Sequence, residues 1–251
     1  MKSYNLDSID KVFQFATQFS PENHSVFRGV NNSEYDLIPS VGRLPPLSNR
    51  DEELDREKAL LEQFKMKSAL RVPSKPSNDW EWLSLAQHYG LPTRLLDWSI
   101  NPLIALYFAT AHSPEELYGA SELNDCAVYV LISHIHIDSS YHIHPFGLDE
   151  TLEFYAPNIS ERVINQAGLF TVHHNPRSAF DTEKLHKFVI PGGLKPLIQA
   201  KLNLLGVSES TIYPGLDGIA KSLKTEFYNQ TTQPLNLEKA PKYMQSQLNG
   251  L

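Results

Sequence analysis

The stretch that decides the fold is WLSLAQHYGLPTRLLDWSINPLIALYFAT, from Trp82 to Thr110. Its first part predicts a helix that ends near Gly90, a favoured helix C-cap residue. Its last part begins at Asn101-Pro102 and is apolar and aromatic, and proline is accepted in a first helical turn. The polar residues between these two helices must be paired if they are buried. The stretch therefore predicts a capped helix and a buried helix with a pocket between them.

Three polar residues of this stretch, His88, Arg94 and Asp97, lie within ten residues of one another. A purely structural interpretation is available for each. His88 would interact with the dipole at a helix C-terminus, and Arg94 and Asp97 would form a local ion pair that shapes a turn. In the functional interpretation they line a cleft, where His88 titrates near neutral pH and Asp97 orients its ring.

Outside this stretch, hydrophobic spacing predicts further helices over 8–19, 51–70 and 193–207, and a short one from about Leu216. Strands are predicted at HSVFRGV, DCAVYVLIS, GLFTVHH and LHKFVIP. No repeat or linker divides the chain. The predicted fold is a single α+β domain over 1–251, with a small mixed or antiparallel sheet flanked by helices. Its core would span about 20–228, and a polar tail 229–251.

The bulk composition of the 251 residues is ordinary for a globular protein, with 41% hydrophobic and 20% charged residues. The net charge of -7 argues against a general nucleic-acid or membrane-surface binder, although a local basic patch would still allow nucleic-acid binding. The one cysteine, Cys126, is expected to be a small buried residue. No signal peptide or membrane span is predicted, so a cytoplasmic location is expected.

Two polar residues outside the opening stretch could reach the same cleft. Arg28 lies in a short strand-like run and needs an anion or a carboxylate if it is buried; it could grip a phosphate in bidentate fashion or pair with Asp97. Gln166 precedes Gly168 and a strand, and could line the cleft as donor and acceptor. We expect Arg28, His88, Arg94, Asp97 and Gln166 to converge on one concave site.

The run SHIHIDSSYHIHP holds His134, His136, His142 and His144, in two pairs spaced i,i+2. Two histidines on one strand face are compatible with a metal. The helical HExxH spacing is absent and Asp138 is the one acid nearby, so no metal is expected. The chain also lacks GxSxG, Walker, GxGxxG and CxxC motifs, which removes many common enzyme classes.

Two motifs of the sequence resemble those of a known family. Phe27-Arg28-Gly29, followed about sixty residues later by LAQHYGLPTRLLDWSINPLIALYFA, resembles the FRG-domain family, which is named after the first triplet. ERVINQAGLF and IYPGLDGIAKSLK look like further landmarks, so the resemblance spans roughly Phe27 to Leu223. The position after Asp97-Trp98 is often threonine in the family; here it is Ser99, which keeps the hydroxyl.

A more distant resemblance, to ADP-ribosyltransferase folds, implies a chemistry. In those folds an arginine on the first core strand, often followed by glycine, binds the phosphate or ribose of NAD; Arg28 and Gly29 match this. A segment with a hydroxyl and a following aromatic helix, here Ser99 to Phe108 with Tyr107, walls the nicotinamide pocket. A late Glu or Gln completes the site, which matches Gln166. The departure is the missing catalytic glutamate, with Glu153 and Glu161 as nearby candidates.

The resemblance implies an NAD-binding, ADP-ribosyltransferase-like enzyme, as a toxin or phage-defence effector that modifies a macromolecular acceptor. Its catalytic residues would be His88, Asp97 and Gln166. Its cofactor-binding residues would be Arg28, Gly29, Arg94, Ser99 and Tyr107. Two alternatives stay open. One is a non-catalytic module that binds a nucleotide or a modified macromolecule, and the other is a hydrolase or nuclease that uses His88 and Asp97 as acid and base.

Overall fold

The computed structural model describes residues 1–19, 24–72, 75–111, 123–132, 136–155, 168–213 and 215–231. The strands are β1 (Lys2–Asn5), β2 (Ser25–Val30), β3 (Leu95–Ser99), β4 (Cys126–Ile132), β5 (His136–Ile137), β6 (Leu152–Phe154), β7 (Gly168–Val172) and β8 (Leu185–Ile190). The helices are α1 (Ile9–Thr17), α2 (Arg50–Ser68), α3 (Asp79–His88), α4 (Pro102–Thr110), α7 (Lys195–Leu204), α8 (Glu209–Ile212) and α9 (Leu216–Thr231), with 3-10 turns η2 (Ser40–Arg43) and η3 (Gly192–Leu194).

The strands form one mixed sheet in the order β1-β8-β4-β2-β3-β7-β6-β5. The two outermost pairs, β1 with β8 and β5 with β6, are parallel, and the others are antiparallel. The predicted α+β class, with a mixed sheet flanked by helices, is confirmed. The sheet is larger than predicted, because β1, β3, β5 and β6 join the four strands that the sequence indicates.

Polar residues cap three of the helices at their N-termini. The side chains of Ser8, Asn78 and Asn101 accept hydrogen bonds from backbone N–H groups in the first turns of α1, α3 and α4. Gly90 follows α3 with φ of 82°, a left-handed conformation that favours glycine. These caps fix where the helices on either side of β3 begin and end.

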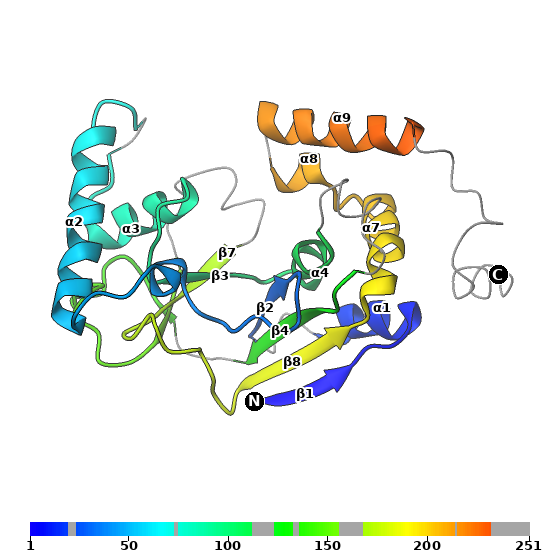
Figure 1. Ribbon diagram of the computed structural model, residues 1–251, viewed down its shortest axis with the longest axis horizontal. Helices are drawn as coiled ribbons and strands as arrows, with labels where there is room; N and C mark the ends of the chain where they lie inside the picture. Colours follow the sequence, from blue (N-terminus) through cyan, green and yellow to red (C-terminus); the bar gives the residue numbers. More distant parts are fainter. Residues whose placement is uncertain are drawn as a thin grey trace, which may run out of the picture.

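Helices cover one face of the sheet in two groups (Figure 1). Helices α1, α4 and α7 pack on β2, β4 and β8 around Phe27, Val128 and Ile190. Helices α2 and α3 pack on β3, β6 and β7, where Trp80 contacts Phe154 with ring centroids 4.9 Å apart. On the other face, Leu37 packs with Trp98 and the neighbouring strand residues. A boundary between the two helix groups therefore falls near β2 and β3.

Strands β2 and β3 are joined at a single register pair, Phe27 with Ser99. In contrast, β2 pairs with β4 from Ser25 to Val30, and β3 pairs with β7 along its whole length. The sheet is thus nearly divided between β2 and β3.

Within the described ranges, no helix combines the length and the apolar character needed to cross a membrane.

Candidate ligand-binding cavity

A cavity of about 430 Å³ opens where β2 and β3 separate. Its walls come from these two strands, the 31–43 segment, the end of α3, one face of α4 and two residues of β7. The charged side chains that line it are Arg28, Asp36, Arg43 and Asp97. The aromatic side chains are Phe27, Tyr35, Trp98, Phe108 and Phe170. The cavity thus combines guanidinium groups, carboxylates and ring faces.

Arg28 bridges the gap between the two strands. Its Nη1 donates to the Asp97 carbonyl oxygen at 2.7 Å and lies 3.6 Å from the Asp97 carboxylate. Burial lowers the pKa of Arg28, the charge of Asp97 raises it, and the charge of Arg43 lowers it. Nε of Arg28 is buried and has no hydrogen-bond partner among the described residues. The Arg28 guanidinium therefore hydrogen-bonds across the gap where backbone pairing between β2 and β3 stops. The positive charge of Arg43 is nearby, and Arg28 Nε can still donate a hydrogen bond.

Asp97 is held from the other side by a short chain of hydrogen bonds. The backbone N–H of Leu95 donates to Thr93 Oγ1 at 3.1 Å, and that hydroxyl donates to Gln87 Oε1 at 2.6 Å. Because its oxygen accepts from Thr93, the Gln87 amide presents its nitrogen to Asp97 Oδ2, at 2.9 Å. The chain fixes both the orientation of the Gln87 amide and the position of the carboxylate at the cavity.

Nearly all residues that line the cavity fall within the part of the chain that matches a known family. Residues 23–116 match the family model of the FRG domain, and this range holds every lining residue except Leu169 and Phe170. The chain contains an FRG domain. No curated protein and no solved structure matches the chain. The cavity is therefore a feature of the FRG domain, closed by two residues of β7.

Five of the predicted site residues line the cavity of the FRG domain: Arg28, Gly29, His88, Asp97 and Ser99. Ser99 Oγ accepts from the Asn101 N–H at 3.0 Å and so shapes the turn into α4. A Cβ at position 29 would overlap the Ala105 carbonyl oxygen of α4. Glycine is thus required at position 29 because a helix backbone crosses the strand there, whatever the cavity binds.

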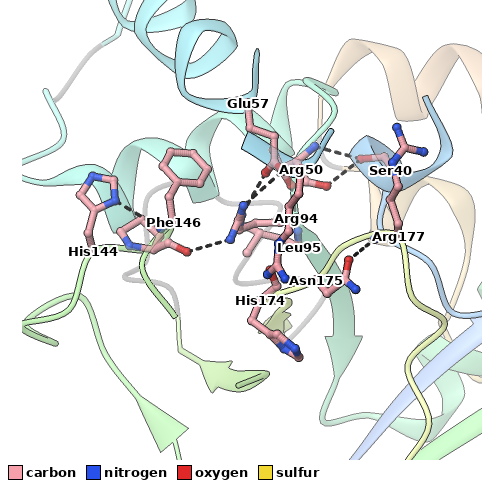
Figure 2. A network of polar contacts seen from close by, with 12 residues as sticks. Ser40, Arg50, Glu57, Arg94, Leu95, His144, Phe146, His174, Asn175 and Arg177 are labelled. Carbon is pink, nitrogen blue, oxygen red and sulfur yellow. Dashed lines mark hydrogen bonds and ion pairs between the residues drawn. The ribbon is translucent and has the colours of Figure 1, made fainter. Parts of the chain in front are cut away.

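Arg94, predicted to lie at the cavity, does not line it. Figure 2 shows its guanidinium directed to Glu57 instead. Its Nε and Nη2 donate to the two carboxylate oxygens of Glu57 in α2, at 2.9 and 3.1 Å, and its Nη1 donates to Pro145 O at 3.3 Å. The guanidinium also lies 4.7 Å from the centroid of the Phe146 ring. The prediction that Arg94 joins the site is wrong, and so is its pairing with Asp97, because a buried carboxylate from α2 takes the guanidinium.

Tyr107, predicted to wall the nicotinamide pocket, also lies outside the cavity. It is buried in the core between the sheet and the helices, and burial raises the pKa of its hydroxyl. Its carbonyl accepts from Gln199 Nε2 of α7 at 3.1 Å. Because successive helical residues are about 100° apart, the next residue, Phe108, faces the cavity instead.

Gln166 and His134 lie outside the described residues, so their predicted positions stay predictions. His144 is exposed, and a 2.7 Å hydrogen bond joins its Nε2 to Asp79 Oδ2. In the described part of the chain, no three His, Cys, Asp or Glu side chains lie close enough together to hold a metal. Cys126 is fully buried, and burial raises the pKa of its thiol to about 12.

Three residues of this region were not predicted from the sequence. Gln87 stands next to His88 in the opening stretch and could have been found by its place in the last turn of α3. Arg43 lies in a segment that reads as loop, and nothing local marks it. His173 is buried behind Trp98, in a chain in which Trp98 Nε1 donates to Thr171 Oγ1 at 2.9 Å and that hydroxyl lies 2.9 Å from His173 Nε2.

Proposed function

We propose that the FRG domain binds a nucleotide-type ligand, with NAD as the leading candidate, in the cavity between β2 and β3. One observation carries the proposal. Arg28 and Arg43 place two guanidinium groups at one cavity, close enough for the charge of Arg43 to lower the pKa of Arg28. Guanidinium groups bind phosphate through paired N–H donors, and an anion between them would relieve their repulsion.

The rest of the lining supports a nucleotide over a simple anion. Tyr35, Trp98, Phe108 and Phe170 offer aromatic surface for a planar ring. Ligand pockets are commonly apolar with a few placed polar groups. A free phosphate would use the guanidinium groups and leave the aromatic wall unused.

The same cavity supports ADP-ribosyl transfer as the reaction. Asp97 places a carboxylate at the cavity, where Gln87 donates to it at 2.9 Å and the Arg28 guanidinium lies 3.6 Å from it. His88 also lines the cavity. Cleavage of the nicotinamide glycosidic bond develops positive charge on the ribose, which a fixed carboxylate would stabilise. A macromolecular acceptor and a role as a toxin or phage-defence effector are the cellular part of this proposal.

The test starts with binding. Isothermal titration of the purified chain with NAD, ADP and inorganic phosphate should show affinity for the two nucleotides and much weaker affinity for phosphate. Arg28→Lys should weaken nucleotide binding although the charge is kept, because an ammonium cannot reproduce the planar fork. Arg71→Lys, at an exposed arginine that does not line the cavity, is the matched control and should bind as the wild type does.

Nicotinamide release then separates enzyme from binding module. With cell lysate as a source of acceptor, the wild type should release nicotinamide, and Asp97→Asn should slow the release about 100-fold or more, as loss of electrostatic support typically does. Binding without release under any condition would favour the module. Absence of binding to all three probes, in a folded protein, would reject the proposal.

A further inference from the structure

The 3-10 turn η2 carries Arg43 to the cavity. Arg43 is the last residue of η2, its side chain lines the cavity, and its Nη1 donates to Ile38 O at 3.2 Å. The residue is exposed, so the packing of the domain does not enclose its guanidinium. The backbone of the turn therefore determines where the positive charge of Arg43 lies.

Arg177, which does not line the cavity, holds the backbone on both sides of Arg43. Its two terminal nitrogens donate to three backbone carbonyl oxygens, those of Gly42 and Leu44 at 3.1 Å and of Pro45 at 3.3 Å. Its Nε donates to the Glu53 carboxylate of α2. One guanidinium thus binds three carbonyls around Arg43 and is itself fixed by α2.

A separate set of hydrogen bonds holds the start of η2. Val41 N donates to Thr93 O at 3.1 Å, and Thr93 N donates to Ser40 Oγ at 3.0 Å. These bonds tie the start of the turn to the chain just before β3. Figure 2 shows Ser40 and Arg177 together at this turn. Loss of the Arg177 bonds would therefore free the end of the turn that carries Arg43, while its start stays attached.

The turn needs this second attachment because of the charge that it carries. Arg28 and Arg43 line the same cavity and carry like charges, which repel each other. Without a bound anion, this repulsion would move the exposed Arg43 side chain and its turn away from the cavity. A residue that holds the turn keeps the anion site formed before the ligand arrives, which lowers the free-energy cost of binding.

We propose that Arg177 is a positioning residue of the cavity, which holds η2 so that Arg43 stays with Arg28 at the site of the ligand's phosphates. This role rests on the proposed binding of a nucleotide. Arginine suits it because the planar fork presents five N–H donors in fixed directions, enough for several carbonyls and one carboxylate. A lysine would keep the charge beside Glu53, but its compact ammonium would not span the same carbonyls.

Titration calorimetry with NAD tests the proposal in a double-mutant cycle of Arg177→Lys and Arg43→Gln. Arg177→Lys alone should weaken NAD binding about 3- to 10-fold, the effect expected when one long side chain must be ordered on binding. In the Arg43→Gln background the same substitution should have almost no further effect, because Arg177 acts through Arg43. A residue that only stabilised the fold would weaken binding equally in both backgrounds.

Arg50→Lys is the matched control. Arg50 Nη2 donates to His174 O at 3.0 Å, so this arginine also ties α2 to the chain after β7, through a bond that does not involve η2. Arg50→Lys should bind NAD as the wild type does. If Arg177→Lys fails to fold, Gly42→Ala serves as the second variant, because its Cβ would overlap Pro176 O and displace the same turn. It should weaken NAD binding only where Arg43 is present.

Amide hydrogen exchange examines the turn without a ligand. The Leu44 N–H, which donates to Val41 O at 3.2 Å, should exchange faster in Arg177→Lys than in the wild type or in Arg50→Lys. A wild type that binds no nucleotide would overturn the proposed function and this role with it. If the wild type binds NAD, an unchanged affinity of Arg177→Lys, an equal loss in the Arg43→Gln background or unchanged Leu44 exchange would overturn the positioning role alone.

Discussion

Replacing Arg94 by methionine should destabilise the FRG domain strongly and leave the proposed binding of NAD in the cavity unchanged. The Arg94 and Glu57 side chains are 3% and 6% exposed, and Arg94→Met leaves the Glu57 carboxylate buried without its partner. Loss of one partner of a buried ion pair costs about 3–5 kcal/mol. Lost hydrogen bonding at Pro145 O and the lost contact with Phe146 act in the same direction. For a chain of this size, such a loss lowers the melting temperature by about 6–20 °C.

Chemical denaturation of four proteins measures the effect: wild type, Arg94→Met, Glu57→Leu and the double variant. The double variant should recover most of the loss, because two apolar side chains of similar volume replace the pair without leaving a buried charge. Ligand titration below the melting temperature should give the same affinity for all four. If Arg94→Met kept its stability but lost NAD binding, Arg94 would be a binding residue of the cavity and not a structural partner of Glu57.

Three further results are expected. Burial, with the charge of Arg28 as the next cause, lowers the pKa of His173 from 6.5 to about 3. Between these two pH values the unfolded chain therefore binds one proton more than the folded chain at this residue. The free energy of unfolding should fall by about 2 kcal/mol from pH 7 to pH 5 for this reason. That loss should disappear in His173→Gln and persist in a control at the exposed His142. Gly29→Ala should lower the free energy of unfolding by about 1–3 kcal/mol or more, unlike Gly147→Ala, whose nearest neighbouring atom would be 3.5 Å away; equal melting temperatures for the two variants would contradict the packing argument. Cys126 should react with a thiol reagent only on unfolding, because burial raises its pKa to about 12, and rapid labelling of the native protein would show otherwise.

The sequence by itself determined the features that depend on neighbouring residues. Asn101 caps α4 through the Leu103 N–H, and Gly90 ends α3 in a left-handed conformation. These interactions close within a few residues, so their pattern is visible in the chain. The strand at Arg28 and the apolar strand that begins at Cys126 were predicted for the same reason, since alternation and β-branched runs are local signals.

Only the tertiary structure decided which charged groups meet. Sequence proximity suggested Arg94 with Asp97, yet Arg94 pairs with Glu57, and Asp97 lies beside Arg28, which is 69 residues away. Such pairs depend on how helices and strands pack, because a buried charge takes whichever opposite charge the packing places beside it. The cavity has the same origin: β3 was not predicted, and its single register pair with β2 separates the strands that Arg28 spans. The residue types therefore indicated a polar site near Asp97, and the packing of distant segments determined which residues form it.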